Sequence, residues 1–272
     1  TYFLLVLINY AVPEIEGELI FNLWKTLILL IPLSIIGFID DLYEIKAKIK
    51  FGIQIITAIL IINFFDINFL NFESGFLFFI FYIGTITFIS GLINIVNFMD
   101  GIDGLVCGIF SLALFIISIK MNVFLLPLSL GFMGFLNKNW YPSKIFMGDA
   151  GSTFLGAIFS VFILQSNSMM EALSVLLLIF PIIMDSIICI LRRLVCGQNI
   201  FKPHKLHLYQ RLVQKGFPHN KVSIIYISSS FLISIFYLTD LLLLQILSIF
   251  FIFGLGVYLE KNYAIPFSSN LK

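Results

Sequence analysis

Long, uninterrupted apolar stretches constrain the fold of this chain more than any other feature of its sequence. Residues 76–96 and 222–239 contain no charged side chain. A helix of about 20 predominantly apolar residues spans the hydrocarbon core of a bilayer. The composition, 60% hydrophobic and 11% charged residues, lies outside that of soluble globular proteins, and the short alternating segments of a membrane β-barrel are not present in the sequence. The sequence therefore predicts an all-α, polytopic helical membrane protein.

About ten apolar stretches are expected to be transmembrane helices, the first of them incomplete. They cover residues 2–12, 23–39, 51–65, 76–96, 105–119, 123–136, 153–165, 172–191, 222–239 and 241–259. No internal repeat or linker separates them, so residues 1–272 are expected to form a single domain. The first stretch is too short to span and lacks the basic flank of a signal peptide, and Thr1 is not an initiator Met. We therefore expect the sequence to begin inside a helix whose start is missing.

The charged residues are distributed unevenly between the loops. If the spans alternate in direction, the loops at 40–50, 97–104, 137–152 and 192–221 and the tail after 259 share one face. Of 16 Lys and Arg residues, only Lys25 and Lys120 fall on the other face. The positive-inside rule makes the basic face cytoplasmic, so the polar motifs are expected on the cytoplasmic side of the membrane. The net charge of +1 gives no indication of a nucleic-acid partner, and the three cysteines show neither metal-site spacing nor a case for a disulfide.

The first polar motif follows the apolar stretch 76–96. Asp100 and Asp103 are three residues apart, which places two carboxylates on one side of a helical turn. Asn94 and Asn97 add amide groups at the same spacing. Acidic groups at a membrane boundary are costly unless they are functional, so the motif indicates a phosphate or metal site. A polar loop between two hydrophobic helices is the alternative.

A second acidic motif ends the stretch 23–39. Asp40 and Asp41 are adjacent and Glu44 follows one turn later. Like charges at a helix C-terminus repel one another and the helix dipole, and a bound cation such as Mg²⁺ would offset that cost. The alternative is a solvated loop in which these acids pair with Lys46 and Lys48.

The third motif lies in the loop 137–152. Asp149 stands between small residues just before a helix, an arrangement that favours a metal–phosphate group. Phe146 is a candidate to stack on a base, and Asn139 and Gly148 complete the candidate site. The alternative is that Asp149 or Ser152 caps the helix.

The long loop 192–221 carries a basic segment with all three histidines of the chain. A helix is predicted from Pro203 to Lys215, because proline favours a helix start and Gly216 a stop. Its expected basic face, together with Arg192 and Arg193, would cover a phosphate; the residues of that face are His204, His207, Arg211, Gln214 and Lys215. The alternative is a purely interfacial anchor. Asp185 lies inside an apolar stretch, with a loop Arg or Lys as its expected partner or a helix-packing role instead.

These motifs together resemble a known family. Asp40-Asp41, NxxNxxDGxDGL at 94–105, NxxPxxxFMGDxGS at 139–152 and a basic His-containing loop recur in that order in the polyprenyl-phosphate N-acetylhexosamine-1-phosphate transferases. The resemblance covers residues 33–222 and implies ten or eleven helices. It also implies transfer of a sugar phosphate from a UDP-sugar to undecaprenyl phosphate, with release of UMP and dependence on Mg²⁺, with Mn²⁺ as an alternative. The resemblance further implies a multi-pass protein of the bacterial inner membrane. Association as a homodimer is left open.

By motif, the resemblance assigns Asp40, Asp41 and Asp149 to the metal and Asn97, Asp100 and Asp103 to the nucleotide side. It places Phe146 near uracil and either Lys48 or Lys50 at a phosphate. The loop reads PHKLHLYQRL, which is neither the triple-His run of the peptidoglycan enzyme nor the His-x-His-His of the common-antigen enzyme. This departure argues against a muramoyl-pentapeptide substrate and is closer to the members that initiate O-antigen.

The expected mechanism follows from charge. A lipid phosphate is mostly a dianion at neutral pH and hardly needs a base, so neutralising charge is the main task. A covalent aspartyl-phosphate route stays open. A transporter would instead need acids spread through the membrane depth, and a CDP-alcohol phosphotransferase would need an Ala-Arg that the motif at 100–103 lacks.

Overall fold

The computed structural model describes residues 17–65, 75–121, 123–199, 202 and 204–267. All regular secondary structure within these residues is helical. This confirms the all-α prediction for the described part. The helices are α2 (Gly17–Tyr43), α3 (Ala47–Phe64), α4 (Phe76–Met99), α5 (Leu105–Lys120), the 3-10 turn η1 (Val123–Leu125), α6 (Leu126–Asn139), α7 (Gly148–Leu164), α8 (Met169–Leu177), α9 (Phe180–Val195), α10 (Leu208–Gln214), α11 (His219–Leu238) and α12 (Leu242–Tyr263).

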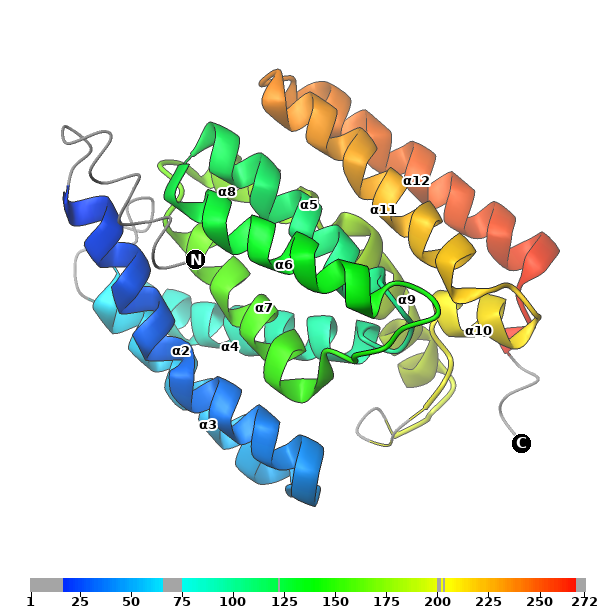
Figure 1. Ribbon diagram of the computed structural model, residues 1–272, viewed down its shortest axis with the longest axis horizontal. Coiled ribbons are helices and arrows are strands. Elements are labelled where there is room, and N and C mark those ends of the chain that lie inside the picture. The colour runs from blue at the N-terminus through cyan, green and yellow to red at the C-terminus, as the bar shows by residue number, and fades with distance from the viewer. Residues whose placement is uncertain (1–16, 66–74, 122, 200–201, 203, 268–272) are drawn as a thin grey trace.

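The helices pack with α5 and α7 at the centre. Figure 1 shows α2 and α3 along one flank, α11 and α12 paired along the other, and α4 to α7 between them. Helix α7 packs against both α2 and α4, and α5 packs against α6 and α11. Most side chains of α5 and α7 are buried, including the edge-to-face pair Phe110 and Phe159. A helix that is apolar on all sides belongs inside such a bundle.

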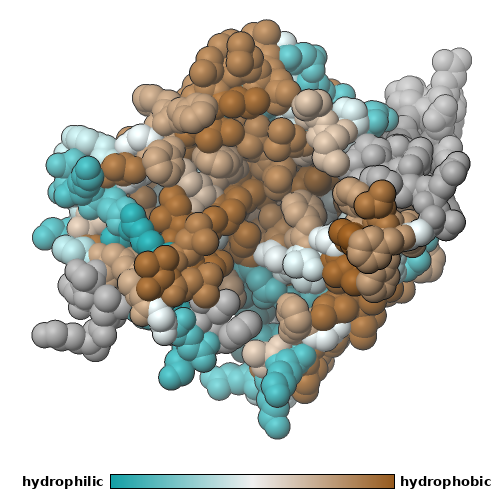
Figure 2. Space-filling model, turned by 180° about the vertical axis from the view of Figure 1, so that it is seen from behind, coloured by the Kyte–Doolittle hydropathy of each residue, from teal (hydrophilic) through white to brown (hydrophobic). Residues whose placement is uncertain are grey.

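The outer surface is strongly hydrophobic. Exposed apolar side chains are numerous on α2, α4 and α12, for example Phe38, Phe76 and Phe250. Figure 2 shows hydrophobic residues across the middle of one face and hydrophilic residues toward its margins. Apolar patches of this extent mark contact with a membrane, and the chain is a multi-pass membrane protein.

The described residues contain fewer membrane-spanning helices than the ten or so that were predicted. Five of their helices are long and apolar enough to cross a bilayer: Lys25–Tyr43 within α2, then α3, α4, α11 and α12. Counting the pair α8 and α9 as one span raises the number to six. Helices α5 and α7 are apolar but shorter. The incomplete stretch 2–12 lies outside the described residues.

One predicted span is broken. The stretch 172–191 forms α8 and α9, which meet at an angle of 82°. Pro181 lies in the first turn of α9, has no N–H to donate and would clash with the carbonyl four residues earlier in a continuous helix. The break turns α9 so that it packs against α4, α10, α11 and α12.

Candidate active site

Carboxylates from two helix ends meet at one lysine. Lys50 lies in the first turn of α3 and donates hydrogen bonds to Asp40 Oδ2 at 2.7 Å and to Asp149 Oδ2 at 2.9 Å. Asp40 lies in the last turn of α2, and Asp149 in the first turn of α7. The ammonium offsets the repulsion between the two carboxylates. Helices α2, α3 and α7 are therefore joined by a charge network at one end of the bundle.

Asp41 anchors the start of α7. Its carboxylate accepts hydrogen bonds from the N–H groups of Asp149 at 2.8 Å and Ala150 at 3.3 Å. These N–H groups have no acceptor within their own helix, and a carboxylate also interacts favourably with the positive end of the helix dipole. Gly148 has φ +65°, and a Cβ there would collide with the Asp41 carboxylate. A carboxylate from another helix thus caps α7, where the sequence had suggested Asp149 or Ser152.

Asn97 extends the network to α4. Its amide nitrogen donates to Asp149 Oδ1 at 2.8 Å and to the Ser152 hydroxyl at 3.0 Å. Asn94 lies one turn earlier and pairs with Gln54, with its Nδ2 2.8 Å from Gln54 Oε1. The two predicted asparagines therefore differ: Asn97 contacts the acids, and Asn94 joins α4 to α3.

Asp100 ends α4 beside these acids. Burial, followed by the negative charges of Asp149 and Asp41, raises the pKa of the Asp100 carboxyl to about 7. A carboxyl with such a pKa is partly protonated at neutral pH, and a cation among its neighbours would favour its charged form. We call Asp40, Asp41, Asp100 and Asp149 the acid cluster.

Asp103 has a different set of partners. Its carboxylate accepts hydrogen bonds from the hydroxyl of Ser143 at 2.9 Å and from the Ser143 N–H at 3.2 Å, and it lies 3.4 Å from His219 Nδ1. The side chain is nearly buried. Asp103 thus joins the loop at 137–147 to α11, and its predicted place on the nucleotide side stays a prediction.

Asn139 likewise joins two segments of the chain by hydrogen bonds. Its side chain accepts a hydrogen bond from the Gly104 N–H at 3.1 Å and donates one to the Ile145 carbonyl at 3.0 Å. Gly104 has φ +72°, and an added Cβ would lie 2.7 Å from the Trp140 ring. The second glycine of the DGIDG motif is thus required by backbone conformation and by the close indole ring.

The remaining candidates near α3 and α7 differ in exposure. The Phe146 side chain is 76% exposed, two residues before α7 begins. Lys48 is exposed as well, whereas Lys50 is half-buried in the acid cluster. Of the two lysines, Lys50 is the one that contacts the acids, and which of them lies at a phosphate stays a prediction.

The predicted basic cover is wrong in its boundaries and its exposed face. Helix α10 begins at Leu208, so His204 and His207 precede it, and Pro203 lies outside the described residues. The Asp185 carboxylate accepts the N–H groups of Leu208 at 2.7 Å and Tyr209 at 3.2 Å, which sets the start of the helix.

Asp185 is paired, but not with a loop Arg or Lys as expected. The Tyr226 hydroxyl donates to Asp185 Oδ2 at 2.7 Å, and His207 Nδ1 lies 3.7 Å from Oδ1. The sequence gave no sign of the contact with Tyr226, because this residue lies within the apolar stretch 222–239 and nothing in the pattern marks its hydroxyl as a hydrogen-bond donor.

The arginines of this region are also engaged. Arg211 is buried and binds Glu260 at 2.8 Å, and Arg192 forms a two-pronged pair with the same carboxylate. Arg193 is buried and donates to the carbonyls of Asn199 and Lys202. The guanidinium groups of Arg192 and Arg211 hold α9 and α10 to α12, and that of Arg193 binds the loop after α9. Arg193 and Arg211 are buried, so they do not form the exposed basic face that was predicted.

Tyr209 joins α10 to the first motif. Its hydroxyl donates to the Phe98 carbonyl at 3.0 Å, two residues before Asp100. The side chain is fully buried, and burial raises its pKa above the ordinary range. A Cβ at Gly101 would collide with this hydroxyl. Helix α10 is therefore a support for the loop that carries Asp100.

Comparison with known proteins identifies the family. The family described as "Glycosyl transferase family 4" matches residues 23–167. A probable undecaprenyl-phosphate N-acetylglucosaminyl 1-phosphate transferase from Bacillus subtilis is 33% identical over 248 residues, which covers 83% of this chain and 68% of that protein. The chain belongs to glycosyl transferase family 4.

Other members are similar over shorter segments. The decaprenyl-phosphate N-acetylglucosaminephosphotransferase of Mycobacterium tuberculosis strain H37Rv is 32% identical over 112 residues, covering 34% of this chain and 27% of that protein. A phospho-N-acetylmuramoyl-pentapeptide-transferase from Carboxydothermus hydrogenoformans is 33% identical over 104 residues, covering 38% of this chain and 31% of that protein.

These matches confirm the resemblance to the polyprenyl-phosphate N-acetylhexosamine-1-phosphate transferases, and the chain is a phosphotransferase of that family. The family 4 match includes every member of the acid cluster together with Lys50 and Asn97. The segment with His204, His207 and α10 lies beyond it.

Proposed function

We propose that this family 4 enzyme transfers an N-acetylhexosamine 1-phosphate from a UDP-sugar to undecaprenyl phosphate, releasing UMP. The lipid-diphosphate sugar so formed would initiate a cell-surface glycan such as O-antigen or cell-wall polymer. The observation that carries the proposal is the acid cluster, in which Lys50 holds carboxylates from α2 and α7 together, with Asp100 among their neighbours, in a member of this family. The relative from Bacillus subtilis, named for N-acetylglucosamine and undecaprenyl phosphate, makes these the first substrates to test.

The acid cluster fits Mg²⁺. Lys50 already places a positive charge between Asp40 and Asp149, and carboxylate oxygens are the ligands that Mg²⁺ prefers, with Mn²⁺ as an alternative. Asp40 and Asp149 would be the ligand pair, with Asp41 close by. When bound, the ion would neutralise charge on the donor pyrophosphate.

The chain's own residues have separate tasks in this proposal. Lys50 is free to turn from the carboxylates toward a phosphate when a divalent cation takes its place between them. Asn97 orients Asp149 by its hydrogen bond to Oδ1. Asp41 holds the N-terminus of α7, so the position of Asp149 depends on it. The lipid phosphate is mostly a dianion at pH 7 and can act as nucleophile without an enzyme base.

The nucleotide is proposed to bind near the start of α7. Phe146 is 76% exposed there, and an exposed aromatic ring next to a phosphate site is suited to stack on a base such as uracil. The acids lie at the ends of α2, α4 and α7 on one side of the bundle, as a membrane-surface enzyme requires, whereas a transporter needs acids through the membrane depth. We place this side in the cytoplasm, where UDP-sugars are made.

The test is an assay of substrate choice. Membranes containing the chain are incubated with undecaprenyl phosphate, Mg²⁺ and radiolabelled UDP-N-acetylglucosamine, UDP-N-acetylgalactosamine or UDP-N-acetylmuramoyl-pentapeptide. We expect labelled lipid and stoichiometric UMP with one UDP-N-acetylhexosamine and none with the pentapeptide donor. Transport of label into vesicles without lipid formation would overturn the proposal.

A further inference from the structure

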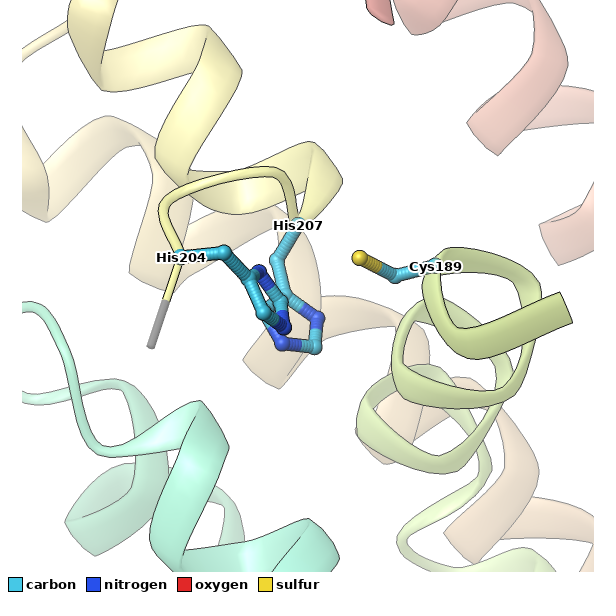
Figure 3. Close-up of side chains that lie close together, drawn as sticks. All are labelled: Cys189, His204 and His207. Carbon is cyan, nitrogen blue, oxygen red and sulfur yellow. The ribbon is translucent and has the colours of Figure 1, made fainter. Parts of the chain in front are cut away.

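A second group of metal-ligating side chains lies away from the acid cluster. Cys189 comes from α9, and His204 and His207 come from the segment that leads into α10. One ligand atom of each residue lies within 4.8 Å of the other two. Figure 3 shows both imidazole rings beside the Cys189 sulfur. The three residues are close because α10 folds back against α9, although their sequence spacing gave no metal signature.

Two of the three side chains are buried, and one ring nitrogen lacks a hydrogen-bond partner. Cys189 is 3% exposed and His207 is 2% exposed. Within the described part of the chain, His207 Nδ1 is buried and has no hydrogen-bond partner. The Asp185 carboxylate is 3.7 Å away, beyond hydrogen-bonding distance. A buried polar atom without a hydrogen-bond partner destabilises the fold, so a ligand at this nitrogen would relieve that cost.

The donor set differs in kind from the acid cluster. One thiolate and two imidazoles form a soft set that suits Zn²⁺, whereas Mg²⁺ prefers oxygen. In a tetrahedral zinc site the ligand atoms lie about 3.3–3.8 Å apart, as follows from Zn–S and Zn–N bonds of about 2.3 and 2.0 Å. The ligand atoms lie up to 4.8 Å apart, so closing the group requires them to approach by up to about 1.5 Å. His204 is half-buried and precedes the first residue of α10, so its side chain is the one that can move.

The protonation state of His204 is compatible with binding. Burial, with smaller effects of His207 and Arg193, lowers the pKa of His204 to about 4, so its ring is neutral at pH 7. The Leu206 N–H donates to His204 Nδ1 at 3.3 Å. Coordination through Nε2 would move the ring proton to Nδ1 and end this long hydrogen bond. Cys189 would lose its thiol proton to solvent when the metal binds.

A cavity lies beside the group. It has a volume of about 130 Å³, lies between α9, α10 and α12 and is lined by Cys189 and Leu206 among other residues. Its charged lining consists of Asp185 and of Glu260 paired with Arg192 and Arg211.

We propose that Cys189, His204 and His207 form a second metal site, for a soft divalent cation of the Zn²⁺ class, distinct from the acid cluster. Two protein elements would supply the three ligands, and the fourth position would be left for water. Because Tyr209 follows His207 by two residues and contacts the Phe98 carbonyl, a bound ion would fix α10 beside the loop that carries Asp100. The site would thereby restrain the support of the active site without contacting substrate.

The test uses Co²⁺ as an optical substitute for Zn²⁺. The purified full chain in detergent is freed of metal, saturated with Mg²⁺ to fill the acid cluster, and titrated with Co²⁺. We expect one equivalent to bind with a thiolate-to-cobalt absorption band and with the d–d spectrum of a tetrahedral ion. Zn²⁺ should abolish both signals, and further Mg²⁺ should leave them unchanged. The readout is absorption, so it does not depend on the proposed transfer reaction.

Variants of the three residues test which side chains bind the ion. Cys189→Ser should remove the thiolate band, and His204→Gln and His207→Gln should each weaken Co²⁺ binding at least about tenfold. Cys196→Ser is the matched control, because Cys196 is exposed and lies outside the group; it should bind Co²⁺ as the wild type does. If the buried His207 variant does not fold, judged by gel filtration, the nearly isosteric Cys189→Ser decides the result. A wild type without the band, or a band that persists in Cys189→Ser, would overturn the proposal.

Discussion

At the scale of residues, Lys50 is what allows the acids to approach one another. Its ammonium contacts Asp40 and Asp149, while the Asp41 carboxylate is satisfied by backbone N–H groups. Asp100 has no such contact among those described for its side chain, and its pKa rises accordingly. The cluster is therefore one positive charge among four carboxyl groups, a balance that a divalent cation would improve.

Replacing Asp149 by Asn tests the metal assignment. Asn keeps the shape of the side chain and loses its charge, so we expect UMP release to fall at least about 100-fold while the protein still inserts and folds. The control is Asp240→Asn. Asp240 is an exposed acid with φ +57°, a conformation that Asn tolerates, and it pairs with Lys120 away from the cluster. Unchanged UMP release in Asp149→Asn would leave Asp149 with a structural role only.

Asp100 should make stability depend on pH. Its folded-state pKa is about 7 against an ordinary value of 3.8. As pH rises through this window the unfolded chain releases the proton first, so the free energy of unfolding falls. The groups that face Asp100 are Asp149 and Asp41, and Lys50 binds Asp149.

In the presence of a metal chelator, the Asp100→Asn variant should therefore have about the same melting temperature as the wild type at pH 4. At pH 8 its melting temperature should be higher than that of the wild type. Thermal unfolding in detergent measures this, and Mg²⁺ should narrow the gap at pH 8 by stabilising the charged carboxylate. The same difference at both pH values would contradict the raised pKa.

At the scale of elements, the close approach of α2 and α7 brings the aspartate pair to Asp149. A Cβ added at Gly37 would lie 2.6 Å from the Ala150 nitrogen and 2.7 Å from the Asp149 carbonyl carbon. No side chain fits there without moving one backbone away from the other. The small residue on α2 thus sets the distance between Asp41 and the N–H groups it accepts.

Gly37→Ala should destabilise the protein by about 1–3 kcal/mol, as overpacking generally does, and lower turnover by separating α2 from α7. Gly52→Ala is the matched control, since a Cβ at Gly52 on α3 meets no atom within 4 Å. Alanine also favours a helix over glycine, so this control should be as stable as the wild type or more so. Thermal unfolding and UMP release are measured for both variants. If Gly37→Ala were as stable and as active as Gly52→Ala, α2 and α7 could separate without a loss of stability or turnover.

At the scale of the whole molecule, the polar groups lie at one end of an apolar bundle. The ends of α2, α4, α9 and α12 and the starts of α3, α7 and α11 gather there, whereas Asp240 joins α11 to α12 at the other end. A helix of 20 residues separates the two ends by about 30 Å, the thickness of the hydrocarbon core. The excess of Lys and Arg at the first end predicts that it faces the cytoplasm.

Cysteine labelling tests this orientation. Cys196 is exposed after α9, whereas Cys107 and Cys189 are buried. A thiol reagent that does not cross membranes should label Cys196 in inside-out vesicles and leave right-side-out vesicles unlabelled. An Asp240→Cys, Cys196→Ser variant should give the opposite pattern. Labelling of Cys196 in right-side-out vesicles would place the acid cluster outside the cell.

The sequence alone determined the helical membrane class and the three motifs that carry the acid cluster. It could do so because apolar length and alternating span direction are local properties, and alternation brings the loops at Asp40, Asp100 and Asp149 to one side. Only the tertiary structure decided which polar groups touch: Lys50 and not Lys48 among the acids, Asp103 with Ser143, and Arg211 with Glu260. A helical period tells which face is apolar, but the partner of a buried charge comes from a distant segment. For the same reason Cys189 meets His204 and His207 without any signature in their spacing.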